Sequence, residues 1–256
     1  MRFSVLGSGS RGNSVFVESG RTNILIDAGF SGKEIASRLH CIGRQLGDIS
    51  ALFLTHEHED HISGAGVISR KCKIPIYANL GTYRAGEKRV GKPFARREFE
   101  TGSVVQMEDL MIRSFRIFHD TADPVGFVVS DGKSSIGYCT DTGKISHLMT
   151  QRLSGCNALI LEFNHNLEML KNGPYPLLLQ QRVRSSMGHL SNEEAAGCLA
   201  GLIGTHLHFA VLAHLSETNN TPIVARNAAR AAVHEWGETA LLVAEQDRAL
   251  PLMDIP

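Results

Sequence analysis

The chain has 256 residues, 43% of them hydrophobic, and its formal net charge is zero. This composition supports a sizeable core, unlike that of disordered chains, and the neutral charge gives no global sign of nucleic-acid or membrane-surface binding. No apolar run reaches the roughly 18 residues of a membrane span, and the first residues lack the pattern of a signal peptide. The five cysteines include no CxxC pair, so we expect reduced thiols in a cytoplasmic protein with no membrane partner.

The first part of the chain predicts short strands around a glycine-rich loop. The strands are expected at residues 2–7, 14–19, 22–29 and 49–55. Gly20 and Arg21 lie between two apolar runs, as in a hairpin turn. Ser31 and Glu34 have the spacing of a capping box, which predicts a helix over 33–43. The last of these strands ends directly on a histidine-rich segment, and α/β folds usually hold their chemistry at the carboxyl end of a buried strand.

The remainder of the chain predicts further strands that alternate with helices. Residues 83–100 carry six basic side chains against three glutamates and are expected to form a helix plus a loop. Strands are expected at 74–80, 103–118 (two strands), 126–143 (a hairpin turning at Asp131-Gly132), 158–166, 208–216 and 239–247. Helices are expected at 193–203, capped by Ser191, and at 221–236. This pattern, without a linker-like segment, predicts a single domain over 1–256 with two packed sheets flanked by helices.

The histidine-rich segment has the composition and spacing of a metal site. His56 and His58 are two residues apart, so in extended chain their side chains project to the same side and can bind one ion together. Asp60 and His61 follow just past the strand end, where the backbone can turn them towards a second ion. Imidazole and carboxylate ligands suit zinc, manganese or iron. The alternative, an exposed acidic loop, is disfavoured because one strand end rarely gathers so many histidines and acids by accident.

Other polar residues directly follow apolar runs and are candidate ligands. His119, Asp141 and His214 each come at the end of a predicted strand. A lone histidine in such a place is more often a core residue, but the neighbouring cluster favours ligation. Asp141 can also bridge two cations held about 3.5–4 Å apart. Asp27, at the end of another apolar run, is expected to orient a ligand histidine.

This ordered set of residues resembles the five motifs of the metallo-β-lactamase superfamily and spans most of the chain. The resemblance implies an α/β fold, a four-layer αββα sandwich, with two divalent metal ions, zinc or manganese. The first ion would be held by His56, His58, His119 and bridging Asp141. The second would be held by Asp60, His61, Asp141 and His214.

Smaller motifs resemble the YycJ (WalJ) exonuclease subgroup of this superfamily. They are LGSGSRGNS, FHDTADPVGF, YCTDTG, LEFNH, GPYP, GHLSNEEA and AHLSETNN. The resemblance implies a DNA exonuclease, with ribonuclease Z as a more distant relative. The chain departs from the subgroup at Phe163, where a small polar residue is typical, and at Asn166, where aspartate is typical. There is no room for the long RNA-binding arm of ribonuclease Z, so a tRNA-processing role is disfavoured.

Phosphodiester hydrolysis suits these residues. Two cations can neutralise the phosphate oxygens and supply a hydroxide at neutral pH, which Asp60 would orient. The leaving alkoxide needs a proton, and His189 in GHLSN is the best candidate donor. By resemblance to ribonuclease Z, His189 pairs with Glu162, which would keep the imidazole protonated. The alternative is that His189 only closes the loop before the Ser191 cap.

Candidate substrate contacts are less specific. Ser10 and Asn13 lie in a loop that either offers backbone N–H groups to a phosphate or forms a tight turn. His165 either contacts phosphate or is structural. Arg182 and Arg184, with the basic stretch 84–97, either track a nucleic-acid backbone or form a solvated surface.

Three functions fit the motifs. The first is a metal-dependent phosphodiester hydrolase, an exonuclease acting on DNA, with RNA as a possible further substrate. The second is a small-molecule hydrolase of the same fold, a cyclic phosphodiesterase or thioesterase. The third, a metal-binding regulatory protein without turnover, is disfavoured because binding alone needs neither an open bridging position nor a proton donor.

Overall fold

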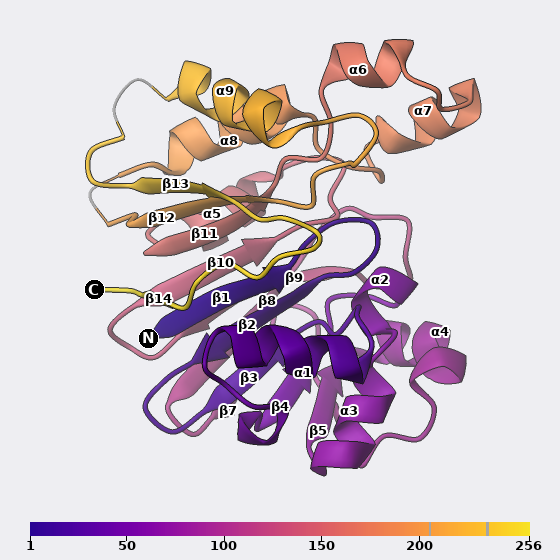
Figure 1. The fold of residues 1–256 in the computed structure, drawn as a ribbon, viewed down its shortest axis with the longest axis vertical. Coiled ribbons are helices and arrows are strands. Elements are labelled where there is room, and N and C mark those ends of the chain that lie inside the picture. Colours follow the sequence, from indigo (N-terminus) through magenta and orange to yellow (C-terminus); the bar gives the residue numbers. More distant parts are fainter. Residues whose placement is uncertain (205, 234–235) are drawn as a thin grey trace.

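The computed structural model describes residues 1–204, 206–233 and 236–256, which form two mixed seven-stranded sheets (Figure 1). The first sheet has the order β14-β1-β2-β3-β4-β5-β6. Its strands are β1 (Arg2–Gly7), β2 (Ser14–Glu18), β3 (Asn23–Ile26), β4 (Ala51–Phe53), β5 (Pro75–Ala78), β6 (Ala95–Glu98) and β14 (Met253–Asp254). The second sheet has the order β13-β12-β11-β10-β9-β8-β7. Its strands are β7 (Val104–Met107), β8 (Leu110–Arg116), β9 (Val125–Ser130), β10 (Ser135–Cys139), β11 (Ala158–Glu162), β12 (Phe209–Ala213) and β13 (Ala240–Val243).

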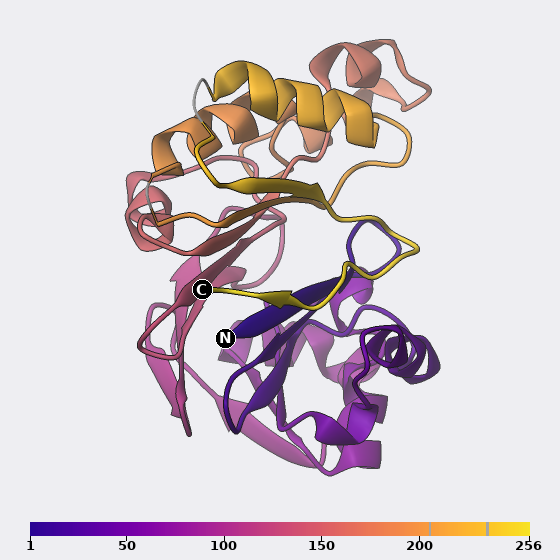
Figure 2. The same cartoon turned by 60° about the vertical axis from the view of Figure 1, so that its left-hand side comes forward.

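Helices cover the outer face of each sheet, so the molecule has four layers (Figures 1 and 2). The first sheet is covered by α1 (Gly32–Cys41), α3 (Ala65–Cys72) and α4 (Leu80–Val90). The second is covered by α5 (His147–Leu153), α8 (Asn192–Leu202) and α9 (Pro222–Ala232). Shorter elements connect these layers: the 3₁₀ turn η1 (Leu46–Asp48), α2 (Glu59–Ile62), α6 (Leu167–Asn172) and α7 (Leu177–Val183). The expected αββα sandwich is therefore confirmed.

The alternation of side chains along the strands explains the layers. On β1, Phe3 and Val5 are fully buried between the sheets, where they join Phe127 and Tyr138 of the second sheet in one cluster. Leu6, on the opposite face, packs with the helices outside the first sheet. Each sheet thus buries both of its faces, which is why the sequences of its inner strands are nearly continuous apolar runs.

Most expected strands and helices are present at the predicted places, including both hairpins. The β2–β3 turn is closed by a bond from Ser19 N to Thr22 O of 2.9 Å, and Gly132, with φ of 85°, turns the β9–β10 hairpin. The Ser191 capping box is complete, with bonds of 3.2 and 3.0 Å. At Ser31 only the cap bond forms, since the Glu34 carboxylate pairs with Arg38 instead.

The segment 83–100 differs from its prediction. The helix begins earlier, at Leu80, and residues 95–98 form the strand β6 rather than a loop. β6 pairs only with β5 and carries exposed charges, as edge strands do, so it lacks the apolar alternation that predicts a strand. The predicted helix 221–236 ends at Ala232, and positions 234 and 235 lie outside the described residues.

Within the described ranges, none of the helices is long and apolar enough to cross a membrane.

Candidate metal centre

The candidate ligands meet at one edge of the sandwich because the strands that precede them point the same way. β3 and β4 are parallel, as are β10, β11 and β12, and their carboxyl ends reach the same edge. Three residues just past these ends, Asp27, Asp141 and His214, have φ angles of 60°, 59° and 54°. This left-handed conformation is energetically unfavourable for residues other than glycine. Such strain is typical of functional sites, where the surrounding structure imposes it.

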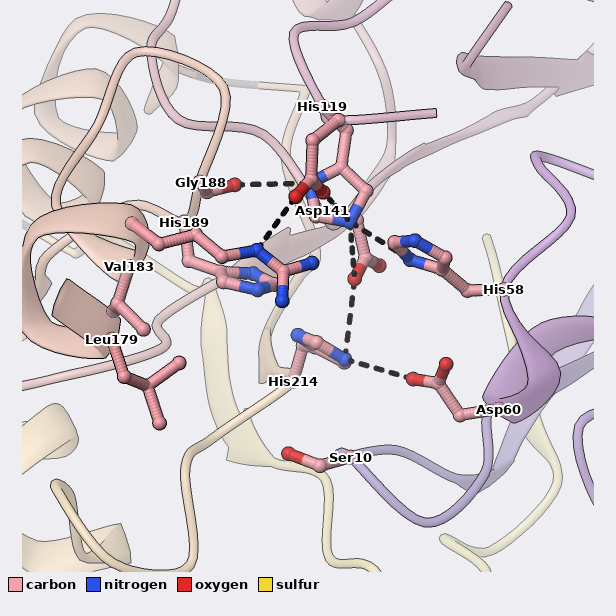
Figure 3. Close-up of a pocket in the computed structure, with 12 residues that line it drawn as sticks. Ser10, His58, Asp60, His119, Asp141, Leu179, Val183, Gly188, His189 and His214 are labelled. Atoms are coloured by element: carbon pink, nitrogen blue, oxygen red, sulfur yellow. Dashed lines mark hydrogen bonds and ion pairs between the residues drawn. The ribbon is translucent and has the colours of Figure 1, made fainter. Parts of the chain in front are cut away.

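The first cluster consists of His56, His58 and His119, whose ligand atoms lie within 4.8 Å of one another. His119 Nε2 is 3.2 Å from His58 Nδ1 (Figure 3). His119 Nδ1 lies 3.1 Å from the carbonyl of Gly188, so it donates there and leaves Nε2 as a lone-pair donor. His56 Nε2 is buried and has no hydrogen-bond partner among the described residues. Three imidazole nitrogens thus converge on one point.

The second cluster consists of Asp60, His61, Asp141 and His214. The Asp141 carboxylate lies 3.3 Å from both His61 Nε2 and His214 Nε2. Its Oδ1 is also 3.9 Å from His119 Nε2, which belongs to the first cluster. Asp141 therefore belongs to the second cluster and also faces the first, the placement expected of a bridging ligand.

A buried network behind the clusters holds two of the histidines. Asp27 Oδ2 lies 2.7 Å from His61 Nδ1, so His61 presents Nε2 to the second cluster. Thr55 donates to the same carboxylate from its hydroxyl at 2.8 Å and from its backbone N–H at 2.9 Å. The Thr55 hydroxyl also lies 3.0 Å from His56 Nδ1. Thr55 was not predicted from the sequence, although it directly precedes His56.

The electrostatics of the centre favour a bound cation. Burial opposes ionisation of Asp141, but the neighbouring His214 and His61 hold its pKa well below the usual range. Burial likewise opposes the charged form of His214, but Asp141, Asp60 and Glu162 raise its pKa to about 10; the carboxylates thus attract positive charge, and a bound cation would take the place of that proton. Burial lowers the pKa of His56 and keeps that imidazole neutral, as a metal ligand must be. The buried carboxylates, neutral imidazole and unpartnered nitrogens fit divalent ions.

Glu162 and His189 form a pair beside the second cluster. Glu162 Oε1 lies 2.9 Å from His189 Nδ1 and 3.0 Å from His214 Nδ1. Its Oε2 accepts backbone N–H bonds from Thr142 at 3.1 Å and Leu190 at 3.0 Å. Although burial raises it, the pKa of Glu162 falls to about 2 because His189 and His214 lie against it. The ionised glutamate leaves the second nitrogen of His189 available to the pocket.

A pocket of about 190 Å³ opens over both clusters (Figure 3). It is lined by Ser10, His58, Asp60, His119, Asp120, Asp141, Leu179, Arg182, Val183, Gly188, His189 and His214. Of the three expected substrate contacts, the structure brings only Ser10 to this wall. Among the arginines expected to contact nucleic acid, Arg182 lines the pocket, whereas Arg184 and the exposed stretch 84–97 lie outside it.

Asn13 and His165 are buried and do not line the pocket. The Asn13 amide nitrogen lies 3.2 Å from Asp60 Oδ2, and its oxygen accepts from the Ser8 hydroxyl and the Gly9 N–H, both at 2.9 Å. His165 is 1% exposed, and its ring nitrogens have no hydrogen-bond partner among the described residues. The side chains of Asn13 and His165 therefore lie behind the pocket wall, and Asn13 contacts Asp60.

The two departures from the subgroup motif have structural roles. Phe163 is fully buried in the core between the second sheet and its helices. Asn166 caps α6, and its side chain accepts from the N–H of Met169 at 3.0 Å. Neither side chain lines the pocket.

Comparison with known proteins identifies the family. Residues 22–215 match the family described as Beta-lactamase superfamily domain. The chain is 37% identical over 239 residues to the exodeoxyribonuclease YycJ of Bacillus anthracis, covering 93% of this chain and 90% of that protein. It is 39% identical over 223 residues to the exodeoxyribonuclease WalJ of Streptococcus pneumoniae, covering 86% and 83%. The metallo-β-lactamase fold protein YhfI of Bacillus subtilis superposes with a TM-score of 0.76 at 17% identity, over 97% of this chain and 98% of that one.

The chain therefore belongs to the β-lactamase superfamily and has the metallo-β-lactamase fold. Both resemblances predicted from the sequence, to the superfamily and to the YycJ (WalJ) subgroup, are confirmed. Membership of this family, together with the two His/Asp clusters, implies that the protein binds divalent metal.

Proposed function

We propose that the protein is a metal-dependent phosphodiesterase that degrades DNA from an end. The observation that carries this proposal is the pair of neighbouring ligand clusters, with Asp141 of the second 3.9 Å from His119 of the first, beside a histidine–glutamate pair in one pocket. Relatives at 37% and 39% identity are named as exodeoxyribonucleases. The five free cysteine thiols support a cytoplasmic location. We infer that residues 1–256 form one domain.

The proposal assigns two divalent ions, zinc or manganese, to the centre. His56, His58 and His119 would hold one, Asp60, His61 and His214 would hold the other, and Asp141 would bridge them. When bound, the ions would neutralise phosphate oxygens and lower the pKa of the attacking water. Asp60 would accept a hydrogen bond from that water, and the amide of Asn13 keeps its carboxylate in place.

His189 would donate the proton to the leaving sugar oxygen. Its ring lies at the pocket wall, and Glu162 fixes its Nδ1 as the donor to the carboxylate. The remaining nitrogen can then carry a proton towards the substrate.

The test compares substrate classes with one metal-loaded preparation. We expect hydrolysis of linear DNA, with RNA hydrolysed more slowly, and a rate that falls steeply with salt because phosphate contacts release counterions. A thioester and a cyclic nucleotide serve as the substrates of the alternative, a small-molecule hydrolase. If the preparation leaves both nucleic acids intact and turns over either small substrate, the proposal is wrong.

A further inference from the structure

An ion pair between Arg182 and Asp120 lies at the pocket wall, next to the candidate ligand His119. Arg182, on α7, donates from Nε to Oδ2 of Asp120 at 2.7 Å. Asp120 directly follows the candidate ligand His119, and both members of the pair line the pocket. The pair therefore links α7 to the loop after β8 at the pocket wall.

The ion pair between Arg182 and Asp120 contributes little to the stability of the folded protein. The side chains are 60% and 33% exposed, and exposed ion pairs contribute little to stability. None of the residues of α7 is buried, so the helix gains little from core packing either. What the pair does fix is the direction of a planar guanidinium group at the pocket wall.

The guanidinium keeps unused donors. It has N–H groups on Nε and on both Nη atoms, and Asp120 takes only the Nε group. Among the described residues, no acceptor lies within hydrogen-bond distance of either Nη atom, and Arg182 is the only permanently charged cation in the described wall of the pocket. Two free donor nitrogens of fixed geometry match the oxygens of a phosphate group.

We propose that Arg182 binds a non-bridging oxygen of the scissile phosphate and that Asp120 is the positioning residue that aims it. This inference rests on the proposed phosphodiesterase function and deepens it. Arg182 would act on the reacting phosphate itself, in contrast to an arginine that tracks the nucleic-acid backbone at a distance. The distinction can be measured, because a small phosphodiester has a reacting phosphate but no further backbone.

The first experiment measures kcat/KM of Arg182→Ala on linear DNA and on bis(p-nitrophenyl) phosphate. Losing a hydrogen bond to a charged group should lower both values by about 10- to 100-fold. Arg182→Lys should recover little of the lost activity. A lysine ammonium lacks the rigid, planar set of donors with which a guanidinium binds Asp120 and a phosphate at the same time. Arg248→Ala is the matched control, since Arg248 is 74% exposed, pairs only with Glu245 among the described residues and lies outside the pocket. A loss confined to DNA would overturn the proposal.

The second experiment separates positioning from metal ligation by Asp120, whose Oδ1 lies 3.6 Å from His119 Nε2. If Asp120 acts through Arg182, Asp120→Ala should cost activity in the wild-type background and almost nothing beside Arg182→Ala. Its metal content should stay at the wild-type level. Additive losses, or lost metal, would assign Asp120 to the metal centre and overturn its positioning role.

Chemical rescue gives a further test, because added guanidinium would not restore activity if Arg182 had only a structural role. Added guanidinium ions should restore part of the activity of Arg182→Ala, because Asp120 still offers a place for them. They should not restore the double variant with Asp120→Ala. Equal response of the two variants would contradict the proposal.

The outcomes also separate this proposal from the proposed function. If the wild-type protein hydrolyses the small phosphodiester but no nucleic acid, the exonuclease function fails, and the Arg182 comparison still stands on that substrate. If the wild-type protein degrades DNA and Arg182→Ala matches it on both substrates, only the role of Arg182 fails.

Discussion

Glu162 is the buried side chain that organises the proton-transfer side of the pocket. One of its oxygens lies 2.9 Å from His189 Nδ1 and 3.0 Å from His214 Nδ1, so a single carboxylate orients a candidate donor and a candidate ligand. Because its pKa falls to about 2, it is ionised at neutral pH and accepts a hydrogen bond from His189 Nδ1. This geometry suits a leaving group that must be protonated as it departs.

The first prediction concerns His189→Ala. On DNA the leaving group is a sugar alkoxide that needs a proton, so kcat should fall by about 10²–10⁴-fold. On bis(p-nitrophenyl) phosphate the leaving phenolate is stabilised without a proton, so the variant should keep most of its rate. Elemental analysis should find unchanged metal. Equal losses on the two substrates, or lost metal, would mean that His189 supports the site and does not donate the proton.

The residues of the site differ in how well the sequence predicts them. Asp141 and His214 stand out because each is a polar residue directly after an apolar run. Thr55 and Asp120 do not, because threonine and aspartate are common and their partners are distant in sequence. The side chain of Asn13 is buried against Asp60, which the sequence could not predict, because the pattern of a glycine-rich loop does not tell which side chains turn inward.

At the scale of elements, the loop 56–61 is held by tight backbone packing against residues from two other segments. Asn13 N donates to the carbonyl of Asp60 at 2.8 Å, and Ala28 N donates to that of His61 at 2.7 Å. Gly29 lies against the same loop, where a Cβ would come within 1.7 Å of the Asp60 carbonyl oxygen. The loop can keep this position only if residue 29 has no side chain.

The second prediction concerns Gly29→Ala. The added carbon must push the Asp60 backbone away, which should cost roughly 1–3 kcal/mol of stability or more and weaken metal binding through displaced Asp60 and His61. Thermal unfolding and metal titration measure the two effects. Gly47→Ala is the matched control, because a Cβ there meets nothing within 4 Å. A Gly29→Ala protein with wild-type melting and metal affinity would refute the tight packing.

The elements predicted best are those with a strong apolar pattern. β11 and β12 are buried on both faces and appear in the sequence as unbroken apolar runs. β6 and α7 were not predicted, because neither buries an apolar face: β6 is a charged edge strand and α7 has no buried residue. β6 pairs with β5, and α7 supplies Leu179, Arg182 and Val183 to the pocket wall.

At the scale of the whole molecule, the two sheets each supply half of the metal centre. The loops after β3 and β4 of the first sheet carry Asp27 and the segment 56–61. The loops after β8, β10 and β12 of the second sheet carry His119, Asp141 and His214. Each cluster therefore contains ligands from both sheets, so the centre forms only when the sandwich is assembled, and bound metal should in turn stabilise that assembly.

The third prediction concerns metal content. Elemental analysis of the saturated protein should give two ions per chain, and Asp141→Ala, which removes the shared carboxylate, should weaken both sites. His56→Ala should empty mainly one, because His56 belongs to the first cluster alone. Metal should also raise the melting temperature. A saturated wild-type protein with a single ion would refute the two-ion assignment.

The central claim, metal-dependent degradation of DNA from an end, is tested most directly by one linear duplex and the same duplex closed into a circle. Protein stripped of metal should leave both intact. After metal is restored, we expect mononucleotides to be released from the linear duplex while the circle persists, and Asp141→Ala to release none under the same conditions. Cleavage of the circle at a rate similar to that of the linear duplex, or equal activity with and without metal, would contradict the account.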